Sequence, residues 1–370
     1  MRAIGIIMAG GNSQRLKDLC KLRAIAAMPM AGAFRAIDFA LSNMANSNIN
    51  KVAVIAQYNS RSLQDHLSAA KWWDLDRKQG GLFIFTPFLS RENNYWFRGV
   101  ADSIYQNISF LKRSHEPYVV LASGDAIYKM DYNDIINYHI EKGADITICY
   151  KDIAGSDKNP QDFGIIQLDH EERMASFEEK PLEPKGTLAS LGIYVIQRSL
   201  LIKLLEAANA DGNYDFVKDI ILRNKNELNI FGYKYDGYWS TLNSINAYMN
   251  TNMDFLKKDV REMLTTPPYI VTKPKDEPPA KYNYGADVKN TIVASGSIIN
   301  GTARNSVLFR NVFLGEYSSV KNSIIMGSSY IGKGCVIENA ILDKEVVVAD
   351  GKQIIGEPGN PIVISKGQIV

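Results

Sequence analysis

The chain has 370 residues, of which 46% are hydrophobic, so it can bury a large core and has the length of two or three domains. Its 42 Lys and Arg residues nearly balance its 40 Asp and Glu residues, which argues against a nucleic-acid partner or a charged membrane surface. No apolar run reaches the roughly 20 residues that a membrane-spanning helix needs.

The amino-terminus enters a strand-like apolar run directly, without the basic region and cleavage site of a signal peptide. The three cysteines and four histidines are scattered along the chain and form no motif of paired ligands. This scatter disfavours both a disulfide framework and a zinc site. We therefore expect a protein of the reducing cytoplasm.

The first residues predict a phosphate-binding loop. An apolar run over 4–9 has the character of a buried strand and ends in the pair Gly10 and Gly11. Backbone N–H groups of a glycine-rich loop after a strand can reach phosphate oxygens. Arg15 follows closely enough for its planar guanidinium to hold a phosphate as well.

Apolar runs and helix-like segments alternate over the first two thirds of the chain. Runs at 52–56, 118–122 and 146–150 predict buried strands, and apolar residues at helical spacing predict a helix over 100–113. This alternation predicts an α/β domain with a mostly parallel sheet. Ligands bind such sheets beyond the carboxyl ends of the strands, where the glycine pair and Asp125 are both expected.

The amino-acid composition and the spacing of apolar residues change in the last third of the chain. Prolines between 265 and 279 favour an extended linker. From about residue 290, an aliphatic residue recurs about every six positions, with Gly, Ser or Asn between. A period this short predicts a β-helix in which each turn stacks its aliphatic side chains on the next, with an ordinary β-sandwich as the alternative.

Several motifs together resemble those of the bacterial glucose-1-phosphate adenylyltransferases, or ADP-glucose pyrophosphorylases. The similar stretches are 4–16 (IGIIMAGGNSQRL), 34–43 (FRAIDFALSN), 96–102 (WFRGVAD), 124–132 (GDAIYKMDY), 177–181 (FEEKP), 191–194 (LGIY) and 215–219 (DFVKD). Because they occur in the order found in the family, the resemblance covers essentially the whole chain.

The resemblance implies both a fold and a reaction. It implies a Rossmann-like nucleotidyltransferase domain of GT-A-like type over 1–256, a linker over 257–289 and a left-handed parallel β-helix over 290–370. The family transfers AMP from ATP to glucose 1-phosphate, which releases pyrophosphate and makes ADP-glucose for glycogen. Because two anions meet, this reaction needs basic side chains and Mg²⁺ held by carboxylates.

The resemblance also assigns individual residues to ligand sites. It implies nucleotide binding by Gly10, Gly11 and Arg15, sugar-phosphate binding by Lys180, Asp215 and Lys218, and metal binding by Asp125. We interpret the first two groups as vestigial sites and the third as a weak, incomplete metal site. Binding of Mg²⁺ to this chain is therefore expected to be weak or absent.

Positions that carry charge in the family are neutral here. Ile25 stands at a lysine position, Thr241 at the position of the second metal-binding aspartate, and Asn243 at a nearby glycine position. A neutral hydroxyl is a far poorer Mg²⁺ ligand than a carboxylate. Losing one preorganised charge at such a site typically costs about 10²–10³ in rate, so we expect no intact catalytic site. Further departures are Ser13, Leu22, Phe97 and Ala126.

The predicted function is that of a regulatory, catalytically impaired subunit of the GlgD type. It would assemble with a catalytic homologue as a hetero-oligomer such as a tetramer, with a small phosphorylated molecule as a further ligand. Three alternatives stay open: an active nucleotidyltransferase with altered substrate choice, an acyltransferase β-helix, and a pure assembly module. The sequence has no histidine after His170, which disfavours the second, and the retained Arg15, Asp125, Lys180 and Lys218 weigh mildly against the third.

Overall fold

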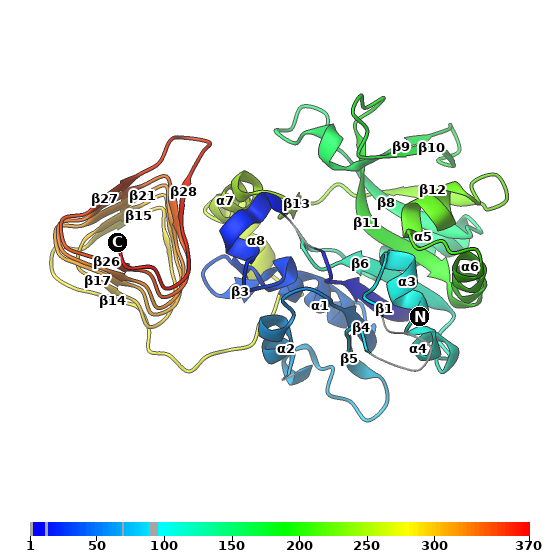
Figure 1. The fold of residues 1–370 in the computed structure, drawn as a ribbon, viewed down its shortest axis with the longest axis horizontal. Coiled ribbons are helices and arrows are strands. Elements are labelled where there is room, and N and C mark those ends of the chain that lie inside the picture. The colour runs from blue at the N-terminus through cyan, green and yellow to red at the C-terminus, as the bar shows by residue number, and fades with distance from the viewer. Residues whose placement is uncertain (1–2, 12–13, 69, 89–94) are drawn as a thin grey trace.

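The computed structural model describes residues 3–11, 14–68, 70–88 and 95–370, which form two domains (Figure 1). The amino-terminal domain is built around a mixed β-sheet. The carboxy-terminal domain is a triangular coil of short strands, which Figure 1 shows end-on. The chain passes between them after helix α8 (Lys258–Thr265).

One large sheet organises the amino-terminal domain. Its strands are β1 (Ala3–Met8), β4 (Lys51–Ile55), β5 (Gly81–Phe85), β6 (Tyr118–Ser123), β8 (Ile146–Asp152), β9 (Gly164–Leu168), β10 (Met174–Glu179), β11 (Leu188–Gln197) and β12 (Ile230–Lys234). In the described residues their order is β10-β9-β11-β6-β1-β4-β5, with β8 paired to β11 and β12. β6, β1, β4 and β5 are mutually parallel, whereas β11 runs antiparallel to β6, β8 and β9.

Both faces of this sheet are covered by helices. In β1, Ile7 packs in one apolar cluster, and Ile4 and Ile6 pack in another. Strands buried on both faces have continuous apolar sequences, which is why the runs at β4, β6 and β8 predicted strands. Helices α1 (Ala36–Asn46) and α5 (Tyr132–Glu141) contribute to the first cluster, and α3 (Val100–Tyr105), α4 (Ile108–Lys112) and α6 (Arg198–Ala210) to the second.

The helix predicted over 100–113 is interrupted. α3 ends at Tyr105 and α4 begins at Ile108. Between them, the side-chain amide of Asn107 donates a hydrogen bond to the carbonyl of Ser103 at 2.9 Å. Side-chain bonds to the backbone of this kind compete with the regular helical pattern, so one predicted helix becomes two.

Short elements carry much of the predicted site. Strands β7 (Ala126–Tyr128) and β13 (Trp239–Thr241) form an antiparallel pair in which Ala126 lies opposite Thr241. The other elements of the domain are the 3₁₀ segments η1 (Gln14–Cys20), η2 (Ile25–Ala27), η3 (Ala70–Trp73) and η4 (Pro160–Asp162), the π-helical η5 (Phe216–Leu222), strands β2 (Pro29–Met30) and β3 (Phe34–Arg35), and helices α2 (Arg61–Leu67) and α7 (Ile245–Asp254).

Residues 281–370, all of which are described, wind into three parallel five-stranded sheets. From Thr302 to Ile355, neighbouring strands are in register 17 residues apart, and the Cys335 amide donates to the Ser318 hydroxyl across the same spacing. Aliphatic side chains such as Leu314 and Ile331 stack inside the coil, and Asn305 and Asn322 occupy corners with positive φ, which asparagine tolerates. This arrangement agrees with the predicted left-handed β-helix and excludes the β-sandwich alternative.

The strands of this domain are short. They are β14 (Lys281–Tyr282), β15 (Asp287–Lys289), β16 (Ile292–Val293), β17 (Ile298–Ile299), β18 (Thr302–Arg304), β19 (Val307–Leu308), β20 (Phe313–Leu314), β21 (Ser319–Lys321), β22 (Ile324–Ile325), β23 (Tyr330–Ile331), β24 (Val336–Glu338), β25 (Ala340–Leu342), β26 (Val347–Val348), β27 (Gln353–Ile355) and β28 (Ile362–Ile364). β14 and every third strand after it form one sheet, and β15 and β16 begin the other two in the same way.

The two domains share an apolar core. Phe39 and Tyr248 of the amino-terminal domain cluster with Ile324 and Ile341 of the β-helix. A buried ion pair crosses the same interface, since Arg23 Nη2 lies 2.7 and 3.0 Å from the carboxylate oxygens of Asp343. The β-helix is therefore fixed against the amino-terminal domain by apolar contacts and by charge.

The extended segment between α8 and the β-helix is also fixed. The Val271 amide donates to the Ser42 hydroxyl at 2.9 Å, and the Val271 carbonyl accepts from the Trp73 indole at 3.2 Å. The segment therefore follows the amino-terminal domain before it reaches the β-helix. In the part of the chain that the structure describes, no helix combines the length and the apolar character needed to cross a membrane.

Candidate functional site

A cleft of about 340 Å³ opens at the carboxyl edge of the parallel strands. Met8, Ile55 and Ser123, which end or adjoin the ends of β1, β4 and β6, all line it. The sequence placed the site at this edge, where the strands end and the backbone turns away from the sheet. The other lining residues are Gly10, Gly11, Gln57, Phe97, Arg98, Gly99, Val100, Ser103 and Asp125.

The glycine loop meets an apolar side chain where the family resemblance implies a lysine. A Cβ atom added to Gly11 would lie 3.8 Å from Cδ1 of Ile25. Ile25 is 6% exposed and belongs to the apolar cluster shared with the β-helix. Position 25 therefore adjoins the loop that would hold phosphate, but its side chain offers no charge there. Ser13, a further departure of the same loop, lies outside the described residues.

The Arg15 guanidinium contacts a carboxylate of the same chain. Its guanidinium Nη1 forms an ion pair with Asp162 Oδ1, although the two residues are 147 positions apart. The local sequence around Asp162 carries no signal that would have revealed this contact.

Asp125 and Thr241 are brought together. Ala126 pairs with Thr241 between β7 and β13, and the Leu242 amide donates to the Asp125 carbonyl at 3.2 Å. Position 241 thus lies beside Asp125, and the family resemblance implies a second metal-binding carboxylate at this position. Asn243 follows in the turn between β13 and α7.

The donor set does not fit the magnesium site that the family resemblance implies. The Ser123 hydroxyl donates to the Asp125 carboxylate, and Thr241 supplies only a neutral hydroxyl. Burial raises the pKa of the Asp125 carboxyl, an effect that the Ser123 hydrogen bond and the charge of Lys180 partly oppose. In the described ranges, no three His, Cys, Asp or Glu side chains converge in a way that could hold a metal ion.

The predicted sugar-phosphate residues lie near the cleft, and one of them, Lys180, has a carboxylate beside it. Lys180 Nζ lies 3.9 Å from Glu179 Oε1. Burial raises the pKa of Glu179, while Lys180 lowers it and Asp215 raises it further. The Asp215 carboxylate accepts the Lys218 amide at 2.7 Å and so caps η5, whereas the Lys218 side chain is exposed. The structure therefore groups Asp125, Glu179, Lys180 and Asp215 electrostatically.

Arg98 and Gln57 line the cleft, but the sequence analysis assigned no role to either of them. Arg98 Nη2 lies 3.0 Å from Asp102 Oδ1, and its guanidinium stacks 3.7 Å from the centre of the Tyr214 ring. The Arg98-Gly99 pair in the stretch 96–102 was an available signal for it. Gln57, whose side-chain oxygen accepts the Phe97 amide at 2.7 Å, follows a plain strand and had no such signal.

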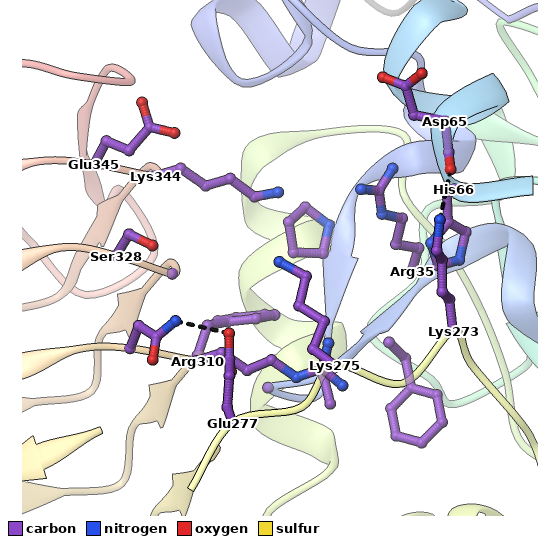
Figure 2. Close-up of a pocket in the computed structure, with 17 residues that line it drawn as sticks. Arg35, Asp65, His66, Lys273, Lys275, Glu277, Arg310, Ser328, Lys344 and Glu345 are labelled. Carbon is purple, nitrogen blue, oxygen red and sulfur yellow. Dashed lines mark hydrogen bonds between the residues drawn. The ribbon is translucent and has the colours of Figure 1, made fainter. Parts of the chain in front are cut away.

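A second cavity of about 340 Å³ lies between the domains (Figure 2). Figure 2 shows Lys344 extending from the β-helix toward Arg35, with Lys275 of the connecting segment below them. Arg310 also lines this cavity, and its buried Nε has no hydrogen-bond partner among the described residues. Burial, followed by the charges of Arg35, Arg23 and Lys275, lowers the pKa of Lys344 to about 8.

Comparisons with known proteins agree with the two-domain architecture. The family described as "Nucleotidyl transferase" matches residues 4–258, and the family described as "GlmU-like, C-terminal hexapeptide" matches residues 278–360. A glucose-1-phosphate adenylyltransferase of Bacillus cytotoxicus is 36% identical over 365 residues, which cover 98% of this chain and 96% of the relative. A protein of the same name from Bacillus anthracis is 35% identical over 373 residues, which cover 99% of each chain.

Proposed function

The chain belongs to the glucose-1-phosphate adenylyltransferase family, and we propose that it is a regulatory, catalytically impaired subunit of that enzyme. In this proposal it assembles with a catalytic homologue that makes ADP-glucose from ATP and glucose 1-phosphate for glycogen. Mg²⁺ binds this chain weakly or not at all, and the GlgD-type subunits are its functional counterpart.

The placement of Ile25 and Thr241 is the observation that carries this proposal. Ile25 adjoins the glycine loop, and Thr241 adjoins Asp125, so both departures lie where charge is needed. A transfer between two anions depends on charges fixed in advance around the reacting phosphorus. Replacing a cation and a carboxylate by neutral groups therefore weakens binding of the triphosphate and of its metal together.

A second observation supports a regulatory role. The interdomain cavity holds basic side chains from both domains, including Arg35, Lys344 and Arg310, and the Nε of Arg310 has no hydrogen-bond partner in the described part of the chain. A small phosphorylated ligand would find donors and positive charge there. Because the cavity wall includes residues of both domains, such a ligand would favour one arrangement of the domains over others.

The outer surface of the β-helix supports assembly with a partner. Phe313 and Tyr330 stack at 4.8 Å on one outward face, with Ile298 and Val347 on either side along the same sheet. Tyr330 is 46% exposed, and Ile298 and Val347 are exposed as well. Contiguous exposed apolar side chains commonly mark an interface with another protein.

One observation favours the alternative, an active nucleotidyltransferase with altered substrate choice. The relatives from Bacillus cytotoxicus and Bacillus anthracis, which are matched over nearly their full length, are both named glucose-1-phosphate adenylyltransferase, a name that favours an active enzyme. Under this alternative, Lys180 and Arg98 would act in a reaction that needs neither the lysine nor the second carboxylate of the family.

Purification of the chain alone separates the two functions. ADP-glucose synthesis from ATP, glucose 1-phosphate and Mg²⁺ should stay near background, and other nucleotides and sugar phosphates should give no more. Co-expression with the catalytic homologue from the same cell should give a complex on gel filtration and alter the turnover or effector response of that homologue. Robust turnover by the isolated chain would overturn the proposal, and so would failure to form any complex.

A further inference from the structure

The Arg15–Asp162 ion pair joins two segments that are distant in sequence. Arg15 follows the glycine loop, and Asp162 ends η4 just before β9, whose hairpin with β10 leads to Lys180. The side chain of Arg15 is 66% exposed and that of Asp162 is 26% exposed. The pair therefore lies at the surface, where water and dissolved anions can reach it.

The backbone beneath Arg15 is held firmly. Leu16 and Leu19 of η1 are fully buried and pack in the apolar cluster that also contains Ile25. This packing fixes η1 and leaves the long Arg15 side chain projecting from it. The guanidinium can therefore exchange partners by changing rotamer, while the backbone stays in place.

The backbone beneath Asp162 is held by independent contacts. The Asn159 side-chain oxygen accepts the Gln161 amide at 3.1 Å, which caps η4. The Phe163 ring packs 5.1 Å from the Trp239 ring, and the Phe163 carbonyl accepts the Lys180 amide at 3.1 Å. Asp162 is thus tied to the strand that ends at Thr241 and to the segment that carries Lys180.

We propose that the Arg15–Asp162 pair is an autoinhibitory latch, in which Asp162 competes with nucleotide phosphates for the guanidinium of Arg15. The inference deepens the proposed function and rests on it, because it gives a further reason why the cleft binds triphosphate poorly. The family resemblance assigns Arg15 to the nucleotide, whereas here a carboxylate of the chain occupies the same group.

The competition has a simple electrostatic basis. A guanidinium holds carboxylate or phosphate oxygens through the same fork of N–H donors, so a phosphate at Arg15 must displace Asp162. The displaced carboxylate then stays near the polyphosphate and repels it. Because the pair is exposed, the internal contact is weak enough to be displaced by a multiply charged ligand. Lys180 is similarly screened by Glu179 at 3.9 Å.

Calorimetry with inorganic tripolyphosphate in the absence of magnesium tests the latch. All proteins are the full-length chain and carry Lys344→Met, so that the interdomain cavity competes less for the probe. Asp162→Asn should tighten tripolyphosphate binding by about three- to tenfold, since it removes both the competing contact and the repulsion. The change to asparagine keeps the size of the side chain and removes only its charge.

Two matched variants isolate the role of Arg15. Asp157→Asn removes one negative charge from the same loop and should change the affinity by less than about twofold, because an exposed charge away from Arg15 is screened. Adding Arg15→Met to Asp162→Asn should abolish the gain, because the two side chains act as one unit. Circular dichroism confirms that each variant is folded.

Three outcomes would overturn the latch. Asp157→Asn could raise the affinity for tripolyphosphate as much as Asp162→Asn does, or the gain could persist without Arg15. In the third outcome, Asp162→Asn binds tripolyphosphate no better than its parent protein. Turnover plays no part in this test. An active wild-type chain would therefore reject the proposed function and leave the latch standing, whereas an inactive chain with no Asp162→Asn effect would reject the latch alone.

Discussion

The cleft at the sheet edge and the cavity between the domains have the same volume, about 340 Å³, but different charge. Among the described residues, Arg98 and Asp125 are the charged groups that line the cleft. The interdomain cavity is lined by five basic side chains and three carboxylates: Arg35, Lys273, Lys275, Arg310, Lys344, Asp65, Glu277 and Glu345 (Figure 2). The positive charge that a phosphorylated ligand requires is therefore concentrated between the domains.

The difference lies in what each cation contacts. Around the cleft, Arg15 pairs with Asp162, Arg98 with Asp102, and Lys180 lies near Glu179. In the interdomain cavity, no hydrogen bond or ion pair in the described part of the chain involves the Lys344 ammonium, whose pKa is lowered by burial and then by neighbouring cations. A compensated cation gains little from a new anion, whereas an uncompensated one gains both charge and hydrogen bonds.

The largest effect is expected from breaking the ion pair beside the interdomain cavity. Arg23→Met leaves Asp343, which is 2% exposed, without its cation. Removing one partner of a buried pair should lower the free energy of unfolding by about 3–5 kcal/mol. Urea denaturation of the isolated chain measures this loss, and anion binding between the domains should weaken with it.

The exposed pair of Arg304 with Asp287 provides the matched control. Arg304→Met should lower the free energy of unfolding by less than about 1 kcal/mol, because surface pairs are screened by water. Equal losses from Arg304→Met and Arg23→Met would contradict the view that a buried pair fixes the two domains.

Restoring charge to the cleft should produce the next largest effect. Ile25→Lys combined with Thr241→Asp places a cation beside the glycine loop and a carboxylate beside Asp125. ADP-glucose synthesis with Mg²⁺ should rise at least about 10²-fold over the wild-type background, and each single change should do little. Pyrophosphate release by the purified proteins measures the gain.

Ile25→Met with Thr241→Asn is the neutral control, since it changes the same positions without adding charge. A folded charged double variant that is no more active than this control would show that the cleft has lost more than these two groups. The Asp162 latch is one such further obstacle. The double variant Ile25→Lys and Thr241→Asp is therefore also assayed with Asp162→Asn added.

The effect of one substitution in each cavity on sulfate affinity compares the two cavities directly. Lys344→Met should weaken sulfate binding by about five- to tenfold, because a charge-assisted contact to the anion is lost. Arg98→Met, at the cleft, should change it by less than about twofold, since Arg98 is already compensated by Asp102. Calorimetry at constant ionic strength measures both affinities. A larger effect from Arg98→Met would reverse the comparison.

The smallest effect concerns pH. The pKa of Lys344 is about 8 in the folded chain, below its ordinary value of 10.5. Folding therefore carries a penalty that is full below pH 8 and disappears as the pH rises from 8 to 10.5. Lys344→Met should raise the free energy of unfolding at pH 7, and this gain should fade over that range. Lys352→Met, an exposed control, should show no such pH dependence.

Much of the fold could be predicted because its signals are local. The continuous apolar runs predicted β4, β6 and β8, since strands buried on both faces need apolar residues at every position. The six-residue period predicted the β-helix. The same reasoning joined α3 and α4 into one helix, because apolar spacing does not register the hydrogen bond of Asn107 to Ser103 that interrupts them.

The candidate site was predictable only in part. Motif order pointed to Asp125 and Thr241, and β7 and β13 bring these positions together. The proximity of Ile25 to Gly11 depends on how η2 packs beneath the loop, which the sequence does not state. Asp162 carried no signal, since a single aspartate in a loop looks like any solvated charge.

The sequence by itself determined the family and the order of the two domains, and it predicted the positions where charge is missing. These are properties of periodicity and of motifs that are short enough to be read locally. Only the tertiary structure decided where the remaining charges go. Arg15 meets Asp162 across 147 positions and Arg23 meets Asp343 across 320, because sheet and β-helix packing bring distant segments within hydrogen-bond reach. The energy between two charges depends on the distance between their atoms, and only the folded chain sets that distance.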